Sequence, residues 1–295
     1  MTDPSEILYV SDLDGTLLTP DSYFPDDAAD RLNRLIDNGL QFTIATARNY
    51  DSVQPVLSRL NLNLPVILFN GVYMTELHSG ENLALTGSLC QNMVVDLMAL
   101  AESLKLDPFV YTYTKRHQVF YRNITNRGSR SYVNYVNSLG AGNRLQYVTD
   151  YKFLEVENVT GVLFIDTYLA LEPLYQELSK KHENKVNMYF AEDISQPEFY
   201  WLQIFHSRTN KGNMLEKLAK YLGIEMKNTV AFGDYLNDLE MFDVVGQAIA
   251  VANALPEVLS AADLIIGTNA ELAVIDYLEK QFLLSNNSSF SSIKK

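Results

Sequence analysis

Apolar runs and helix-type repeats of apolar positions alternate along the first third of the chain. Residues 7–11 form an almost unbroken apolar run, which predicts a strand buried on both faces. Residues 26–39 carry apolar positions at helical spacing, namely Ala29, Leu32, Leu35 and Ile36. Further expected elements are strands at 40–47 and 65–70 and a helix at 51–60. This alternation predicts a parallel sheet with helices on both faces.

The last third of the chain repeats the alternation, so the same sheet is expected to continue there. The expected elements are helices at 210–223, 237–246, 256–262 and 270–282 and strands at 229–234, 247–253 and 263–267. Ligands of such sheets bind beyond the carboxyl ends of the strands. Four polar residues, Asp12, Thr46, Asn70 and Asp234, each stand at the carboxyl end of a predicted strand. We therefore expect a functional site at this edge of the sheet.

The middle of the chain differs in composition and in its pattern of apolar positions. Residues 86–207 are rich in tyrosine and phenylalanine, and they mix strand-like runs, such as 161–167, with two helical stretches. Those helices are expected near 90–104 and 170–182. The pattern predicts an α+β domain inserted between two halves of an α/β domain, with aromatic residues that serve mainly as its own core. The expected boundaries are 1–85 and 208–285 for the core domain, 86–207 for the insert and 286–295 for a disordered tail.

Composition narrows the classes of partner. The 295-residue chain has 23 Lys and Arg against 36 Asp and Glu, a net charge of −13, which argues against binding nucleic acid or an anionic membrane. Its one cysteine, Cys90, excludes an intrachain disulfide framework, and we expect it to be a small core residue. We see no secretory signal and no run of ~18 apolar residues, and we therefore predict a cytoplasmic protein.

Two carboxylates stand one residue apart where the first predicted strand ends. Asp12 and Asp14 would repel each other unless a cation or a proton neutralises the pair. A calcium loop of the EF-hand type would need a glutamate near position 23, where Tyr23 stands, so that alternative is disfavoured. The pair therefore calls for a compensating charge from elsewhere in the chain.

Other polar segments are ambiguous when each is taken alone. Thr46 at a strand end is typical of a helix cap, and Asn70-Gly71 is typical of a tight hairpin turn. Lys211 stands at the start of a predicted helix, where the helix dipole disfavours a cation unless an anion lies nearby. Residues 233–238, which read GDYLND, could be a polar loop or a metal site.

Taken together, these segments resemble the motifs of the haloacid dehalogenase-like hydrolase superfamily, and more narrowly of its Cof-type sugar-phosphatase branch. The four superfamily motifs are matched by Asp12-Leu13-Asp14-Gly15-Thr16, Thr46-Ala47-Arg48, Lys211-Gly212 and Gly233-Asp234-Tyr235-Leu236-Asn237-Asp238, and the Asn-Gly of the branch by Asn70-Gly71. Ala47 stands where the branch usually has glycine, which would slightly restrict the backbone there. The resemblance covers nearly the whole chain and implies an α/β fold, a Rossmann-like parallel-sheet core with an inserted α+β cap of the C2 type.

The resemblance also implies a chemistry, the Mg²⁺-dependent hydrolysis of a small phosphomonoester through an aspartyl-phosphate. Asp12 would be the nucleophile, and Asp14 the general acid and base. Mg²⁺ would lie between Asp12 and Asp234, with the backbone carbonyl of Asp14 as a further ligand and Asp238 as an indirect contact. Residues expected to bind the phosphoryl group or to orient its ligands are Thr46, Lys211 and Asn237, and candidates for substrate contact are Arg48, Asn70 and Gly71.

Two other functions are compatible with the motifs. A phosphoryl-transfer mutase would use the same aspartyl-phosphate, but relatives of that type usually carry a smaller helical cap. A catalytically silent phosphate-binding regulator would keep the fold without needing the intact set of acidic and basic residues. The expected partner is thus a small phosphorylated metabolite such as a sugar phosphate, not nucleic acid or a membrane. The sequence leaves the physiological substrate and the oligomeric state open.

Overall fold

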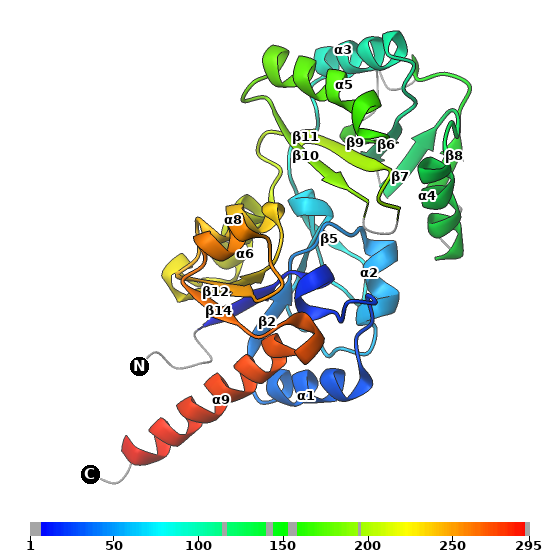
Figure 1. Cartoon of the computed structure of the whole chain (residues 1–295). Helices are drawn as coiled ribbons and strands as arrows, with labels where there is room; N and C mark the ends of the chain where they lie inside the picture. Colours follow the sequence, from blue (N-terminus) through cyan, green and yellow to red (C-terminus); the bar gives the residue numbers. More distant parts are fainter. Residues whose placement is uncertain (1–6, 114–116, 140–143, 153–157, 194–195, 293–295) are drawn as a thin grey trace. The chain divides into compact units, whose positions relative to one another are not determined.

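The computed structural model describes residues 7–113, 117–139, 144–152, 158–193 and 196–292, with side chains up to residue 282. The chain forms two compact units, which we name the core unit and the inserted unit (Figure 1). The core unit comprises Met1–Leu85 and Asn210–Lys295, and the inserted unit comprises Thr86–Thr209. Among the described residues, no helix has the length and apolar character needed to cross a membrane.

A five-stranded parallel sheet forms the centre of the core unit. Its strands are β1 (Leu8–Ser11), β2 (Gln41–Ile44), β12 (Thr229–Gly233), β13 (Gln247–Val251) and β14 (Leu264–Ile266), in the order β14-β13-β12-β1-β2. The register pairs Ser11 with both Ile44 and Phe232, so β1, β2 and β12 end at the same level. The predicted α/β fold class with a parallel-sheet core is therefore confirmed, and the residues that follow these strands emerge side by side.

Helices cover the parallel sheet on both sides, as the apolar pattern predicts. They are α1 (Asp26–Asp37), α2 (Tyr50–Leu57), α6 (Lys211–Leu222), α7 (Leu239–Phe242), α8 (Pro256–Ala261) and α9 (Ala273–Ser292). Helices α1 and α9 pack together on one side, and α6 and α8 lie on the other (Figure 1). The predicted apolar positions of α1 are all buried, namely Ala29, Leu32, Leu35 and Ile36. Helix α9 continues to Ser292, into the segment for which the sequence predicts a disordered tail, and residues 293–295 lie outside the described part.

The strand predicted at 65–70 does not simply extend the parallel sheet. It becomes β3 (Val66–Leu68), which pairs antiparallel with β4 (Tyr73–Thr75), and β4 pairs with β5 (Asn82–Leu85). A bridge between Ala45 and Ile67 links β3 to the parallel sheet. The turn between β3 and β4 has positive φ at Phe69, Asn70 and Gly71 (53°, 52° and 85°). The hairpin interpretation of Asn70-Gly71 is thus confirmed, because both residue types tolerate this region of backbone space.

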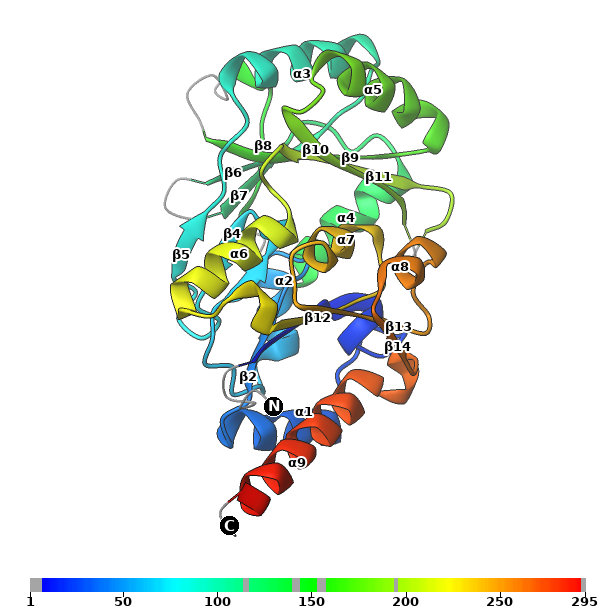
Figure 2. The same ribbon diagram turned by 90° about the vertical axis from the view of Figure 1, so that its left-hand side faces the viewer.

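The inserted unit is built on a six-stranded mixed sheet (Figure 2). Its strands are β6 (Phe109–Tyr113), β7 (His117–Tyr121), β8 (Leu145–Tyr147), β9 (Val159–Asp166), β10 (Val186–Glu192) and β11 (Tyr200–His206), in the order β10-β11-β9-β6-β7-β8. Its helices are α3 (Gln91–Ser103), α4 (Arg127–Ser138) and α5 (Tyr168–Lys181). The sequence predicts α3 and α5 but not α4, whose polar composition masks a short buried face. That face consists of Tyr132, Val133 and Val136, and Asn126 caps the helix through the N–H of Ser129.

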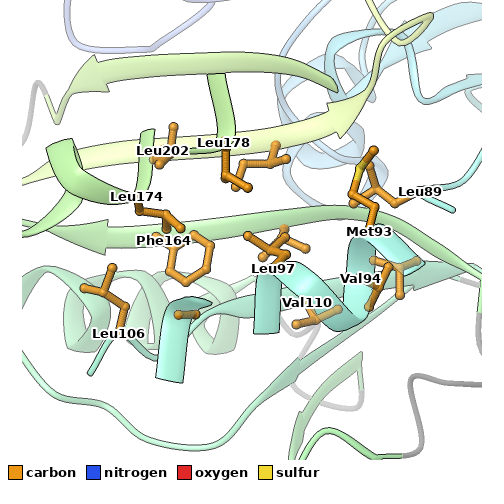
Figure 3. Close-up of a cluster of buried hydrophobic side chains, with 14 of the residues drawn as sticks. Leu89, Met93, Val94, Leu97, Leu106, Val110, Phe164, Leu174, Leu178 and Leu202 are labelled. Atoms are coloured by element: carbon orange, nitrogen blue, oxygen red, sulfur yellow. The ribbon is translucent and has the colours of Figure 1, made fainter. Parts of the chain in front are cut away.

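A hydrophobic cluster joins α3 and α5 to one face of this sheet (Figure 3). Leu97 of α3 and Leu174 of α5 are fully buried in it, and Phe164 of β9 is among its aromatic members. On the opposite face the rings of Phe109 and Tyr132 pack edge to face, with their centroids 4.6 Å apart. The expectation that aromatic residues serve the insert's own core is confirmed for these side chains. The expectation for Cys90 is wrong: it is exposed, because it occupies the N-cap position of α3 rather than the helix's buried face.

Candidate functional site

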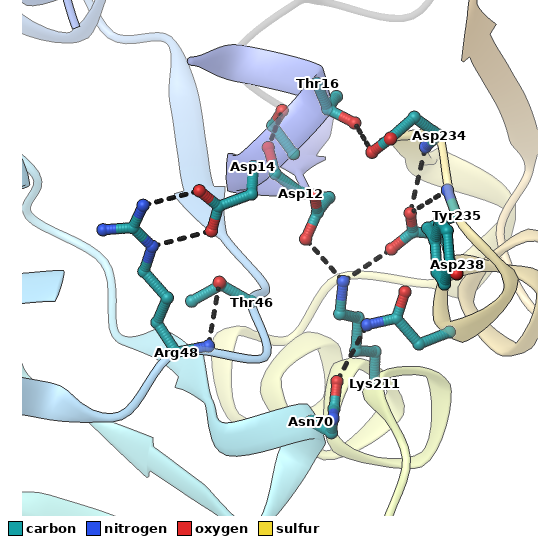
Figure 4. A network of polar contacts seen from close by, with 12 residues as sticks. Asp12, Asp14, Thr16, Thr46, Arg48, Asn70, Lys211, Asp234, Tyr235 and Asp238 are labelled. Carbon is teal, nitrogen blue, oxygen red and sulfur yellow. Dashed lines mark hydrogen bonds and ion pairs between the residues drawn. The ribbon is translucent and has the colours of Figure 1, made fainter. Parts of the chain in front are cut away.

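The predicted site residues gather at the carboxyl ends of three neighbouring strands of the core unit (Figure 4). Asp12 directly follows β1, Thr46 follows β2 and Asp234 follows β12, and the register of the sheet ends all three strands at one level. Lys211 is the first residue of α6, and Asp238 ends the turn before α7. The parallel topology thus brings together residues that stand more than 200 positions apart in the sequence, as with Asp12 and Asp234.

A fully buried ammonium links the acidic residues. Lys211 Nζ donates to Asp12 Oδ1 at 2.5 Å and to Asp238 Oδ1 at 2.6 Å. Burial alone would lower the pKa of Lys211, but the charges of Asp12 and Asp238 and their hydrogen bonds raise it above its ordinary value. Lys211 is therefore a fixed positive charge. Its place at a helix start, which is unfavourable by itself, is explained by these two anions.

Asp238 holds the turn that carries Asp234. Its Oδ2 accepts the backbone N–H groups of Asp234 and Tyr235, both at 3.0 Å, while its Oδ1 accepts Lys211. A Cβ at Gly233 would lie only 2.5 Å from the Cβ of Asp238, so this close approach requires glycine. Asp238 is fully buried, and its hydrogen bonds assign it the role of anchoring both Lys211 and the turn at 234–235.

The acidic cluster carries more negative charge than Lys211 can balance. Asp12, Asp234 and Asp238 each offer an oxygen within 4.8 Å of the others. Burial raises the pKa of Asp12 well above its usual range, and Asp238 and Asp234 add to the rise against the opposing charge of Lys211. Burial, and then the charge of Asp238, raise the pKa of Asp234 to about 7. When all three carboxyl groups are ionised, they and the ammonium of Lys211 leave two negative charges. Carboxylate oxygens are the ligands that Mg²⁺ prefers, so the residues present fit a divalent cation, which would favour the ionised forms.

The loop after β1 is shaped around Asp234. Residues Leu13–Leu17 form a tight, irregular turn in which Gly15 has a φ of 78°. A Cβ at Gly15 would lie 2.3 Å from Asp234 Oδ2, so both the backbone angle and the space require glycine here. The next residue, Thr16, donates from Oγ1 to Asp234 Oδ1 at 2.7 Å. The Gly-Thr of the first motif therefore fits the loop closely onto Asp234.

The side chain of Asp14 lies outside the acidic cluster and pairs with Arg48. Arg48 Nε donates to Asp14 Oδ2 at 2.7 Å and Nη2 to Oδ1 at 2.5 Å, a bidentate ion pair (Figure 4). From the sequence, Arg48 was a candidate for substrate contact, and its ion pair with Asp14 was not predicted. The Asp14 side chain is 42% exposed, so solvent or a ligand can reach it.

The remaining predicted residues form a polar layer beside the cluster. Thr46 Oγ1 accepts the N–H of Arg48 at 3.1 Å, and the Thr46 carbonyl accepts the N–H of Asn70 at 3.0 Å. Asn237 was expected to orient Asp12 or Lys211, and its Nδ2 instead donates to Asn70 Oδ1 at 2.9 Å. A Cβ at Gly71 would lie 2.2 Å from the backbone oxygen of Asn210, directly before Lys211. The Asn-Gly turn therefore packs against the start of α6, in addition to joining β3 and β4.

Two asparagines that the sequence analysis did not single out also reach the loop after β1. Asn253 Nδ2 donates to the carbonyl of Gly15 and Asn269 Nδ2 to that of Leu18, both at 2.8 Å. Asn253 follows β13 and Asn269 follows β14, so both stand near carboxyl ends of strands. The rule that selected Asp12 and Asp234 could have found them, had it been applied to every strand of the sheet.

Known proteins are similar to this chain over most of its length. A family model described as haloacid dehalogenase-like hydrolase matches residues 9–278. The chain is 26% identical over 287 residues to 5-amino-6-(5-phospho-D-ribitylamino)uracil phosphatase YitU of Bacillus subtilis, covering 94% of this chain and 98% of that protein. It is also 26% identical over 283 residues to pyridoxal phosphate phosphatase YbhA of Escherichia coli, covering 90% of this chain and 95% of that protein.

A solved structure has the same fold. The haloacid dehalogenase-like hydrolase from Bacteroides thetaiotaomicron superposes with a TM-score of 0.76 at 24% identity, covering 93% of this chain and 98% of that one. The family match spans both halves of the core unit and the insert between them, and the resemblance drawn from the four motifs is thereby confirmed. The chain belongs to the haloacid dehalogenase-like hydrolase family.

Proposed function

We propose that the protein is a Mg²⁺-dependent phosphatase that hydrolyses a small phosphomonoester through an aspartyl-phosphate on Asp12. The observation that carries the proposal is the buried cluster of Asp12, Asp234 and Asp238 around Lys211, with its excess of negative charge. When bound by Asp12 and Asp234, Mg²⁺ would lower the repulsion between these carboxylates and an incoming phosphate. Asp238, which holds Lys211 and the turn at 234–235, would act on the metal site indirectly.

The contacts of Asp12 support its proposed role as the nucleophile. The ammonium of Lys211 holds Oδ1 and thereby fixes the direction of the carboxylate. In the first half-reaction an Asp12 oxygen bonds to phosphorus while the bond to the ester oxygen breaks. In the second, a water oxygen bonds to phosphorus and the bond to Asp12 breaks, which releases inorganic phosphate and restores the carboxylate.

Asp14 is assigned the proton transfers. In the first half-reaction it gives a proton to the departing ester oxygen, and in the second it takes one from the attacking water. Its partial exposure supports this role, since a group that serves both substrate and water must be reachable from solvent. The ion pair with Arg48 occupies both of its oxygens, so Arg48 must give up at least one of these hydrogen bonds during turnover.

Lys211 and Thr46 are proposed to hold the transferring phosphoryl group. Thr46 Oγ1 accepts the N–H of Arg48, which leaves its own proton to point to a phosphoryl oxygen. Lys211 supplies positive charge where negative charge develops. Substrates of the named relatives, a phosphorylated ribitylaminouracil and pyridoxal phosphate, support a small phosphorylated metabolite as the substrate class.

The proposal is tested with Asp12→Asn. The amide is nearly isosteric and can still accept from Lys211 through its oxygen, but it is not a nucleophile. We expect hydrolysis of p-nitrophenyl phosphate in Mg²⁺ to fall by a factor on the order of 10³ or more, with the fold intact by circular dichroism. Asp30, which is exposed on α1, is changed to asparagine as the control and should keep full activity. Mass spectrometry of the wild-type protein trapped during turnover should find the phosphoryl group on Asp12, and finding it on another residue would remove Asp12 from the nucleophilic role.

A further inference from the structure

The loop after β1 carries Asp12, Asp14 and Thr16 on a backbone without regular geometry. Within this loop Asp14 (φ −77°, ψ 127°) and Gly15 (φ 78°, ψ −10°) depart from helical angles. The N–H of Leu18 donates to the carbonyl of Leu13 at 2.9 Å inside the loop, and the interrupted helical geometry leaves other backbone groups to be bonded from outside it. The residues that donate those hydrogen bonds therefore determine how firmly the position and direction of the Asp14 side chain are held.

One end of the loop is fixed by the parallel sheet. The N–H of Asp12 donates to the carbonyl of Phe232 in β12 at 2.9 Å, which continues the ladder of β1 by one residue. The side chain of Thr16 is tied to Asp234 by the bond already described. These contacts hold the loop at Asp12 and at the hydroxyl of Thr16, but they leave the peptide group between Gly15 and Thr16 to be fixed by other groups.

The other end is fixed by the side chains of two asparagines, and these two residues are also hydrogen-bonded to each other. Asn253 donates to the Gly15 carbonyl and Asn269 to the Leu18 carbonyl. The backbone N–H of Asn269 donates to Asn253 Oδ1 at 2.9 Å, so the two residues form one connected pair, which we call the asparagine pair. Asn269 is buried and Asn253 is exposed. The pair thus spans from the ends of β13 and β14 to the loop that follows β1.

We infer that Asn253 and Asn269 are positioning residues for Asp14, an inference that rests on the proposed phosphatase function. Leu13 and Asp14 lie between an anchor at the Asp12 N–H and an anchor at the Gly15 carbonyl. With both ends held, the direction in which the Asp14 side chain leaves the backbone is set. Arg48 holds the carboxylate of Asp14 but does not hold its backbone. When the carboxylate leaves Arg48 to transfer a proton, the asparagine pair keeps its backbone in place.

The decisive variant is Asn253→Asp, which removes one hydrogen bond with almost no change of shape. The remaining oxygen still accepts the N–H of Asn269, but the group that donated to Gly15 becomes a carboxylate oxygen facing a carbonyl oxygen. Since residue 253 is exposed, the new charge is solvated and the fold should persist. The matched control is Asn33→Asp in α1, because Asn33 Nδ2 donates to the Arg59 carbonyl and its Oδ1 accepts the N–H of Asn61.

The readout is the dependence of kcat/KM on the leaving group, because kcat/KM reports the first half-reaction, in which Asp14 acts as the acid, and not the shared hydrolysis of the aspartyl-phosphate. An alkyl phosphate needs a proton from Asp14, whereas p-nitrophenyl phosphate leaves without one, so a misplaced Asp14 should lower kcat/KM mainly on the alkyl phosphate. For Asn253→Asp we expect kcat/KM on an alkyl phosphate to fall by about 10- to 100-fold and kcat/KM on p-nitrophenyl phosphate by less than about 3-fold. Asn33→Asp should leave both rates unchanged.

The outcomes separate this inference from the proposed function. Asp14→Asn is measured alongside and should show the same selective loss on the alkyl phosphate, only larger. If Asp14→Asn shows it and Asn253→Asp does not, the asparagine pair does not position Asp14 and the inference is overturned alone. An equal loss of kcat/KM on both substrates for Asn253→Asp would also overturn it, because a general loosening of the site affects all substrates. If Asp14→Asn itself shows no selectivity, the acid role in the proposed function fails and the inference fails with it.

Discussion

The cost of burying Asp234 without a cation leads to a prediction about stability. Burial and the neighbouring charge of Asp238 raise its pKa from the ordinary 3.8 to about 7. In metal-free protein above neutral pH, the folded state must therefore hold a buried carboxylate that the unfolded state would expose to water. We predict that Asp234→Asn, which removes this charge, makes the metal-free protein more stable while it removes the response to Mg²⁺.

The sign and size of the expected change in the free energy of unfolding follow from proton linkage. A carboxyl whose pKa is higher in the folded state binds its proton more tightly there, so its contribution to stability is present below about pH 4 and is lost as the pH rises to about 7. A rise from 3.8 to about 7 corresponds to a loss of about 4 kcal/mol from the free energy of unfolding. The asparagine oxygen can still accept the hydroxyl of Thr16, so the variant keeps that hydrogen bond.

Urea unfolding in EDTA measures this effect. The free energy of unfolding is compared between wild type and Asp234→Asn at about pH 5 and about pH 8, with Asp30→Asn in α1 as the control for an exposed aspartate. We expect Asp234→Asn to be more stable than wild type by about 2–4 kcal/mol at the higher pH, and by less at the lower pH. Added Mg²⁺ should then stabilise wild type and the control but not Asp234→Asn, because only a protein with its ligands intact gains from binding.

Two results would refute the reasoning, and each identifies the part that failed. If Asp234→Asn is no more stable than wild type at about pH 8 in EDTA, the folded state does not hold Asp234 as an uncompensated charge. If Mg²⁺ stabilises Asp234→Asn as strongly as wild type, then Asp234 is not a metal ligand, whatever the pH dependence shows.

Two further variants test the basic residues of the site. Arg48→Ala should lower kcat/KM on an alkyl phosphate by about 10-fold with little change on p-nitrophenyl phosphate, and Arg31→Ala, which breaks a two-carboxylate ion pair between α1 and α9, is the control. A rise in KM for every substrate would instead show that Arg48 binds the phosphate. Lys211→Met should abolish turnover and lower the free energy of unfolding by about 3–5 kcal/mol at neutral pH, because it leaves its two carboxylate partners buried without a cation. Equal stability to wild type would count against that charge balance.

The parts of the fold that follow from local pattern were predictable. Strands buried on both faces must be apolar throughout, so β1, β2, β12 and β13 are visible in the sequence as apolar runs. The amphipathic face of α1 is equally visible because its buried residues recur with helical period. The rule that ligands bind at the carboxyl ends of such strands then selected Asp12, Thr46 and Asp234, which the structure places together.

Elements whose form depends on distant partners were not predictable in the same way. The apolar run at β3 fits a parallel strand as well as an antiparallel one, and only the turn at 69–71 sends it back onto β4. Helix α4 is largely polar, because it buries only a narrow stripe of Tyr132, Val133 and Val136. Cys90 was misjudged because a residue type that is usually buried can also occupy a helix cap, where position outweighs hydrophobicity.

The polar pairings within the site show why motif recognition alone falls short of the geometry. Asp14 and Arg48 were each selected, but nothing in their local sequence states that one guanidinium occupies both oxygens of one carboxylate. The choice is made by the register of β1 against β2, which sets the loops that follow them side by side. The same reasoning applies to Asn253, whose partner Gly15 stands 238 residues earlier. A motif identifies the side chains that carry out the chemistry. The order of strands in the sheet decides which neighbouring residues position those side chains. Residues that position the catalytic groups, such as Asn253, are therefore to be sought at the ends of every strand in such a sheet, including strands whose sequence carries no motif.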